Sequence, residues 1–223
     1  MFAAIFEVQP RQGRFDEYLS LAKYLRPKLE AIDGFIEIDR FVNARTQGRV
    51  LSLSTWRDEK AVVRWRTQKD HQAIQQRGRF EVFQDYHLRV GEVIADTAPP
   101  AGLAVVEQRF DATEAGRSKF VTLTELMMQE PAADADLLGV RLRLSAEMDG
   151  LIEQGAFESI YHPGRLLLVA AWRDVDRARS WSPTAPLGAT PMRHRCVRVI
   201  RDYGMFDRRE APQFYPVVNR GAA

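Results

Sequence analysis

One ten-residue frame occurs twice in this chain of 223 residues. Residues 56–65 read WRDEKAVVRW, and residues 172–181 read WRDVDRARSW, 116 positions later. At the same offset, the segment DGFIE at 33–37 aligns with DGLIE at 149–153. Self-similarity at a fixed offset indicates a structural unit that is present twice. The chain is therefore expected to fold as two similar halves.

The boundaries of the two halves follow from the composition of the segment that joins them. Residues 98–102 read APPAG, and two prolines with a glycine interrupt regular structure. We expect a first repeat at 1–97, a linker at 98–102, a second repeat at 103–208 and a C-terminal tail at 209–223. FAAIFEV near the start of the first repeat aligns with LAVVEQR at 103–109, which predicts that the second repeat opens with a strand there.

Each half reads strand, helix, strand, strand, helix, strand. In the first half the helical regions cover 14–31 and 58–77, and the first of them places apolar residues three and four positions apart, as an amphipathic helix does. This order is typical of the ferredoxin-like α+β fold, an antiparallel four-stranded sheet with two helices on one face. The other face also needs a cover, and the second copy can supply it. We expect two tandem βαββαβ repeats that form a pseudo-dimer of the dimeric α+β barrel type. The strands expected in the first half are 2–8, 35–42, 49–56 and 81–95.

Composition argues against several classes of protein. Lys and Arg total 32 against 30 acidic residues, and they are interspersed, so nucleic acid is not an expected partner. No apolar run is long enough to span a membrane. The start of the sequence does not resemble a secretory signal, and Cys196 is the single cysteine, which favours a cytoplasmic location. The four histidines lack metal-site spacing and the glycines form no phosphate loop, so neither a metal nor a cofactor is expected.

The segment WRDEKAVVRWRTQKDHQAIQQRGRFEVFQDY at 56–86 resembles the second half of the antibiotic biosynthesis monooxygenase (ABM) domain. The shared features are a tryptophan at the end of the third strand, W-R in the helix and a histidine shortly afterwards. IDGFIEIDRF at 32–41 is similar to that family too. The resemblance implies a dimeric α+β barrel. It also implies a relationship to cofactor-free monooxygenases of aromatic polyketides and to haem-degrading enzymes.

Three residues of the first half are candidate catalytic residues: Trp65, His71 and Tyr86. In one continuous helix, Trp65 and His71 would point in different directions, because six residues turn the helix by about 240°. However, Thr67-Gln68-Lys69-Asp70 resembles a capping box, which predicts a new helix from about 68 and lets the two side chains converge. Histidine suits proton transfer near neutral pH, an indole can stack on a flat substrate, and a tyrosine can donate to a substrate oxygen.

Other residues of the repeated frame are better explained by packing. Trp56 and Trp172 end equivalent strands in both halves, and large aromatic side chains dominate core energetics. In the second half leucine stands at position 187, opposite His71, and SPTAPLGATP after Trp181 cannot form the corresponding helix. We therefore expect the second half to have lost the pocket or to use this segment as a lid.

Three functions remain open from the sequence. The first is a cofactor-independent monooxygenase that acts on an aromatic or enolisable small molecule. The second is a haem-binding or haem-degrading protein, although such relatives carry an asparagine on the first strand, where this chain has FAAIFEV. The third is a non-catalytic barrel that binds a small ligand. The expected partner is a small-molecule substrate, and a homodimer of the pseudo-dimeric chain is compatible with each function.

Overall fold

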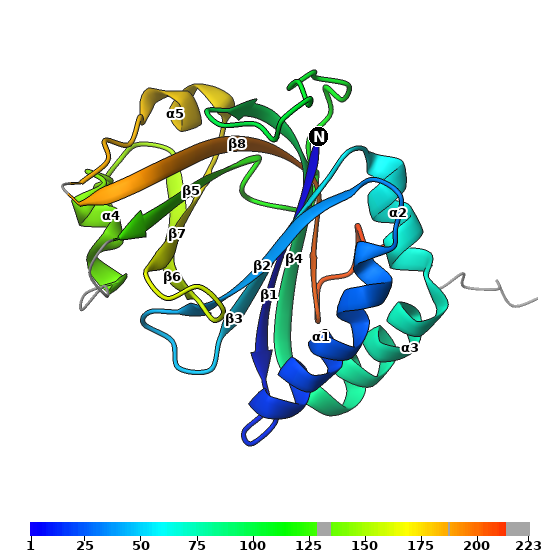
Figure 1. The fold of residues 1–223 in the computed structure, drawn as a ribbon. Coiled ribbons are helices and arrows are strands. Elements are labelled where there is room, and N and C mark those ends of the chain that lie inside the picture. The colour runs from blue at the N-terminus through cyan, green and yellow to red at the C-terminus, as the bar shows by residue number, and fades with distance from the viewer. Residues whose placement is uncertain (129–134, 187, 213–223) are drawn as a thin grey trace, which may run out of the picture.

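Eight antiparallel strands close into one barrel, in the order β1-β3-β2-β6-β7-β5-β8-β4. This arrangement is seen in a computed structural model that describes residues 1–128, 135–186 and 188–212. Helices α1, α2 and α3 cover one side of the barrel, and the short helices α4 and α5 lie on the opposite side (Figure 1). The α+β class and the antiparallel sheet expected from the sequence are confirmed.

The first half follows the predicted element order closely. The helical region expected at 58–77 is divided into two helices, and a π-helical turn at Gly78–Val82 leads into the last strand. Its elements are β1 (Phe2–Pro10), α1 (Phe15–Glu30), β2 (Phe35–Asn43), β3 (Val50–Trp56), α2 (Glu59–Thr67), α3 (Lys69–Arg77) and β4 (Phe83–Asp96).

The second half has the same strand order but shorter helices. The strand expected at 103–109 is wrong, because residues 103–119 run without regular pairing and the equivalent strand starts at Phe120. Leu103 and Val105 of that segment instead pack against the barrel interior. The elements are β5 (Phe120–Met128), α4 (Leu138–Arg141), β6 (Leu151–Ser159), β7 (Arg165–Trp172), α5 (Val175–Ser180) and β8 (Ala189–Gly204).

The two halves share one apolar interior. The strands run β4-β1-β3-β2 in the first half and β8-β5-β7-β6 in the second, and Phe2 pairs with Trp56 as Phe120 pairs with Trp172. Inward-facing side chains of both halves form a single cluster, to which Ile5 and Phe41 contribute from one half and Leu167 and Val199 from the other. Residues 98–102, where a linker was expected, form irregular structure between β4 and the unpaired segment.

Trp56 and Trp172 are packing residues, as expected. Both are fully buried, one on each side of the barrel. The indole N–H of Trp56 donates to Ser54 Oγ at 2.9 Å, and that of Trp172 donates to Thr122 Oγ1 at 2.9 Å. Each polar group of these large side chains is thereby satisfied within the sheet.

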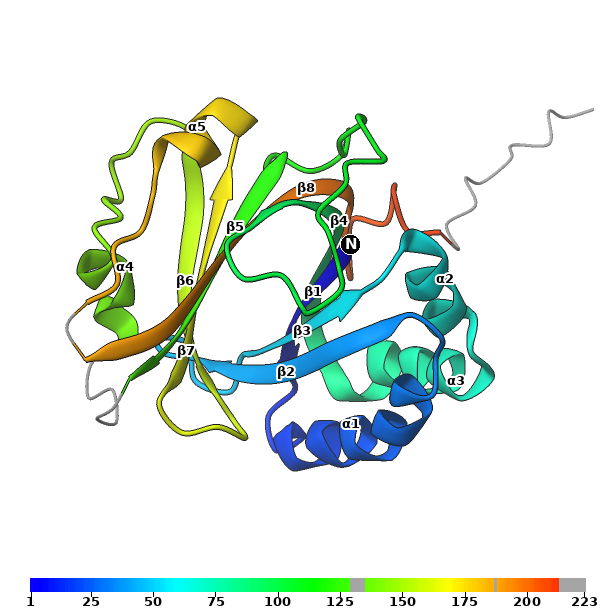
Figure 2. The ribbon, with the colours of Figure 1, turned by 45° about the horizontal axis from the view of Figure 1, so that its top comes forward.

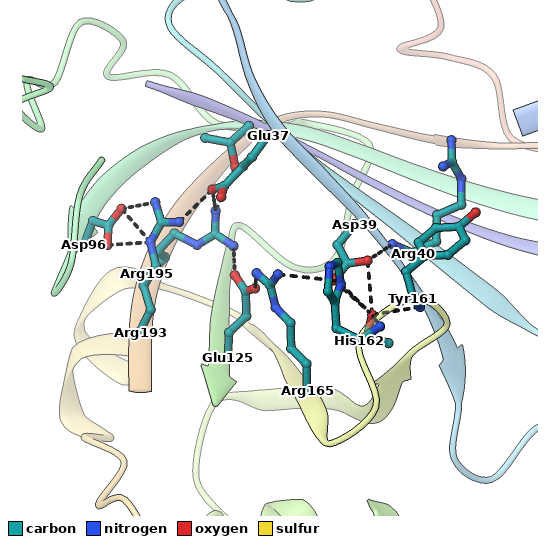
Figure 3. A network of polar contacts seen from close by, with 12 residues as sticks. Glu37, Asp39, Arg40, Asp96, Glu125, Tyr161, His162, Arg165, Arg193 and Arg195 are labelled. Atoms are coloured by element: carbon teal, nitrogen blue, oxygen red, sulfur yellow. Dashed lines mark hydrogen bonds and ion pairs between the residues drawn. The ribbon is translucent and has the colours of Figure 1, made fainter. Parts of the chain in front are cut away.

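A network of buried charges lies inside the barrel where β2 faces the second half (Figure 3). Arg195, which is 1% exposed, donates to Glu125, and Arg165 bridges Glu125 at 2.5 Å to Asp39 of β2 at 3.3 Å. Arg193 reaches Glu37 of β2 at 2.6 Å. Buried charges are tolerated where each has a partner of opposite sign.

The chain that follows β8 contacts both halves. The Glu210 carboxylate accepts hydrogen bonds from the Thr113 hydroxyl and from the backbone N–H of Asp202. Arg208 donates to the hydroxyl of Tyr86. Of the tail expected at 209–223, residues 213–223 lie outside the described residues, as does Leu187.

The buried network predicts a strong effect of removing one shared charge. Glu125→Gln leaves Arg165 and Arg195 without the carboxylate that they share, so we expect a loss of about 3–5 kcal/mol in the free energy of unfolding. Urea denaturation measures it. The matched control is Glu30→Gln, which removes an exposed helix pair with Arg26 and should cost less than about 1 kcal/mol. Equal losses in the two variants would contradict the role assigned to the network.

Candidate functional site

A cavity of about 720 Å³ lies between the barrel and the helices of the first half. Its volume is in the range typical of small-molecule binding sites. Its roof consists of side chains from α1, α2 and α3, and β8 and the tail close one end. The floor is made by the outward-facing residues of four strands: Ala4, Phe6, Ile38, Arg40, Ser52, Ser54, Tyr86, Leu88 and Val90.

Small floor residues and a long helical roof leave this space open. Ser52 lies on the floor in β3, whereas the aligned residue of β7 is Leu168, which packs into a dense cluster on the opposite side of the barrel. Trp181, the counterpart of Trp65, belongs to that cluster, and its ring centroid lies 6.2 Å from that of Trp172. Large side chains therefore occupy the region of the second half that is hollow in the first.

Trp65 and His71 come together at a break between two helices. Helix α2 ends at Thr67, and the side chain of Gln68 accepts the backbone N–H of His71 at 2.7 Å to begin α3. The rings of Trp65 and His71 then stack with centroids 4.0 Å apart and planes 14° apart. The break predicted near residue 68 is confirmed, although Gln68 caps the new helix rather than Thr67.

The surroundings of His71 fix its tautomer and its charge. Its Nδ1 lies 3.0 Å from the carbonyl oxygen of Trp65, which can only accept, so Nδ1 carries the proton and donates. Nε2 is then the basic nitrogen, with the amide of Gln75 at 3.3 Å. Burial lowers the pKa of His71 to about 4, because the charged form loses its hydration. The imidazole is therefore neutral at physiological pH.

Tyr86 lines the same cavity from β4. Its ring centroid lies 5.8 Å from that of Phe6 and 6.3 Å from that of Phe83, and Arg208, which follows β8, donates to its hydroxyl oxygen. Since that oxygen accepts from Arg208, the O–H group can donate to a second partner. All three candidate residues therefore line one cavity.

Several cationic residues of the cavity were not expected from the sequence. Arg40 and Arg66 both have a buried Nε with no hydrogen-bond partner among the described residues. Glu59 is the acidic side chain among the described lining residues, and it binds Arg109 at 2.7 Å. One signal for Arg40 was present in the sequence: it lies two residues after Ile38, so the two side chains share the strand face that the helices cover. The cationic residues that line the cavity are Arg26, Arg40, Arg66, Lys69, Arg79, Arg201 and Arg208.

The described residues contain no cluster of three or more His, Cys, Asp or Glu side chains suited to a metal ion. Among the described helices, none combines the length and the apolar character needed to cross a membrane.

Comparison with known proteins identifies the family. The family model for antibiotic biosynthesis monooxygenase matches residues 1–77. A curated protein of Pyricularia oryzae, jasmonate monooxygenase ABM, is 43% identical over 221 residues, which are 97% of this chain and 99% of that protein. The chain belongs to the antibiotic biosynthesis monooxygenase family. The resemblance seen in the sequence is thus confirmed.

Solved structures support the fold of this ABM protein. A crystal structure of aldoxime dehydratase in complex with butyraldoxime superposes with a TM-score of 0.55. The two sequences are 13% identical, and the match covers 89% of this chain and 79% of that one. At this identity the likeness concerns the fold alone.

The different filling of the two halves predicts different costs for equivalent substitutions. Trp181→Ala removes a buried ring from a dense cluster, so we expect a loss of about 3–5 kcal/mol in the free energy of unfolding. Trp65→Ala enlarges a cavity that already exists and should cost about 1–2 kcal/mol. Denaturant unfolding of both variants tests this. A larger loss for Trp65→Ala than for Trp181→Ala would contradict the assignment of the cavity to the first half.

Proposed function

We propose that this ABM protein is a monooxygenase that acts on an enolisable small molecule in the first-half cavity, without a bound cofactor. The observation that carries the proposal is the cavity itself. It brings a neutral imidazole, an indole stacked on that imidazole and a tyrosine hydroxyl to the wall of one space. Membership of the family supplies the class of reaction.

Jasmonate is the first substrate to test, because a relative at 43% identity is named a jasmonate monooxygenase. Jasmonate is a small carboxylic acid with a cyclopentanone ring, and the carbons beside that ketone can lose a proton to form an enolate. Its mostly apolar body suits the floor that Ala4, Phe6 and Leu88 provide.

The roles of the site residues follow from their surroundings. His71 Nε2 accepts the proton next to the carbonyl, and the enolate that forms beside the imidazolium offsets the cost of charging a buried ring. The Tyr86 hydroxyl donates to the enolate oxygen. Trp65 holds the imidazole plane by stacking and forms a wall for the substrate.

The number of electrons that the reaction needs distinguishes a cofactor-free mechanism from one that depends on a reductant. Conversion of a CH₂ group beside the ketone to a second carbonyl consumes one O₂ and releases one water, so the substrate itself supplies every electron. Hydroxylation of a remote carbon would need two further electrons from an external reductant. Turnover without NADH or NADPH, with oxygen from ¹⁸O₂ located beside the ketone by mass spectrometry, supports the proposal. Strict dependence on a reductant, or a Soret band that saturates with added hemin, contradicts it.

We expect His71→Gln to abolish most of the activity while the substrate still binds. Loss of a general base lowers kcat by about 10²- to 10⁴-fold. The measurement is oxygen uptake with jasmonate, together with binding of jasmonate under anaerobic conditions. His162→Gln is the matched control, because His162 lies in the exposed β6–β7 loop outside the cavity, and a glutamine amide can still donate to Asp39, which His162 contacts at 3.3 Å. Undiminished turnover in His71→Gln would remove His71 from the reaction.

The pH dependence of kcat/KM for the methyl ester of jasmonate, which has no carboxyl group to titrate, should report the low pKa of His71. The neutral ring is the active form, so kcat/KM stays constant around neutral pH and falls as the pH drops through about 4.

The lowered pKa of His71 also weakens the fold in acid. The unfolded state binds the proton more tightly, so stability is lost as the pH falls from about 6.5 towards 4. Melting temperatures at each pH separate the two effects. If kcat/KM instead falls near pH 6.5 while the protein is still folded, the buried environment assigned to His71 is contradicted.

We also infer that the two halves descend from one duplicated unit and form a pseudo-dimer. The identical strand order and the equivalent pairings of Phe2 with Trp56 and Phe120 with Trp172 support this. The role of the second half is then structural, because Trp181 occupies the space that corresponds to the cavity of the first half.

A further inference from the structure

We propose that Arg40 binds the carboxylate of the substrate, so that this cavity selects small organic anions over their neutral analogues. The proposal rests on the proposed function for the identity of the substrate, whereas the anion site rests on the cavity alone. Three observations carry it: an unpaired buried guanidinium, a cavity with an excess of cations, and an apolar floor that leads from Arg40 towards Tyr86.

The guanidinium of Arg40 is buried without a counter-ion. Arg40 is 6% exposed, and no described carboxylate forms an ion pair with it. Its neighbour Asp39 faces the barrel interior, where it binds Ser159 and Arg165. A buried guanidinium without a counter-ion is costly, and a bound carboxylate would neutralise it and accept the hydrogen bonds it has left over.

The groups around Arg40 do not compete for that role. The hydroxyl of Tyr18 lies against the Arg40 side chain, and burial raises the pKa of Tyr18, so the phenol stays neutral. Glu59, the acidic group among the described lining residues, is held by Arg109. The cavity therefore presents cations to its interior, and an anionic ligand would complement it.

The position of Arg40 fits one end of an elongated ligand. Arg40 lies on β2 and Tyr86 on β4, with β3 and β1 between them, so their strands are about 14 Å apart. Ala4 and Phe6 of β1 cover the floor between them. A ligand whose carboxylate is held by Arg40 therefore extends its apolar body towards the tyrosine.

Two other arginines of the cavity lie towards β8 and the segment that follows it. Arg208 is engaged with Tyr86, and Arg66 lies close to Tyr203 of β8. These groups are placed to face an oxygen at the reacting end of the ligand. We therefore assign the carboxylate, at the end of the ligand away from Tyr86, to Arg40.

The test compares two probes that differ only in charge, jasmonic acid and its methyl ester. Isothermal titration calorimetry at pH 7.5 should show tighter binding of the acid to the wild-type protein. In Arg40→Met, affinity for the acid should fall by about 10- to 100-fold, as expected for loss of a charge-assisted hydrogen bond, while affinity for the ester changes little. Arg40→Lys keeps the charge and should recover part of the affinity. Arg117→Met, at an exposed position outside the cavity, is the matched control and should bind the acid as the wild type does.

Stability provides a second readout that a purely structural arginine would not give. Because Arg40→Met removes an unpaired buried charge, the variant should melt at a temperature about 2–4 °C above that of the wild type. If Arg40→Met binds the acid more weakly and also melts at a lower temperature than the wild type, the role of Arg40 is to stabilise the fold. Equal affinity of the wild type for acid and ester, or no saturable binding of the acid, overturns the anion site.

These outcomes separate the anion site from the proposed function. Arg40-dependent binding of jasmonic acid without oxygen uptake supports the anion site and contradicts the monooxygenase proposal. Oxygen uptake with the acid and the ester alike, unaffected by Arg40→Met, supports the monooxygenase and overturns the anion site.

Discussion

The barrel closes on one side through buried charges more than through paired strands. Strand β2 meets β6 only over Phe41–Asn43, whereas Glu37 and Asp39, earlier in β2, reach the arginines of β7 and β8 (Figure 3). Because neighbouring strand residues face opposite sides, these carboxylates also fix which β2 residues point outward. Holding Asp39 inside the barrel places Arg40 on the floor of the cavity. The same contacts thus hold the two halves together and orient a residue of the candidate site.

A second constraint is the volume available between strands and helices in each half. In the first half, α1 and the broken pair α2 and α3 form a roof over a floor that includes the small residues Ala4, Ser52 and Ser54. In the second half, α4 and α5 are short, and Trp181 with its neighbouring leucines occupies the corresponding space. The two sides of the barrel are visible in Figure 2, where the longer helices mark the side of the cavity. One strand plan therefore leaves a cavity on one side and forms a dense core on the other.

Local patterns in the sequence predicted much of the fold. The repeated frame predicted matching strands, and the capping signal at Thr67–Asp70 predicted the break that lets Trp65 meet His71. The strand at 103–109 was wrong because its apolar residues pack at the barrel mouth without pairing, and an apolar pattern does not reveal a hydrogen-bonding partner. Arg208 was missed for a similar reason: its contact with Tyr86 joins residues 122 positions apart, which no local pattern encodes. The excess of arginine over carboxylate in the cavity likewise depends on tertiary placement.

The central claim is that the first-half cavity is the substrate site. The most direct measurement is a crystal structure of the protein with jasmonate bound, refined far enough to orient the ligand. We expect ligand density between the floor strands and α1–α3, with the carboxylate at Arg40 and the ring beside His71 and Tyr86. Density elsewhere, such as the polar recess between the halves lined by Arg89 and Glu153, would contradict it.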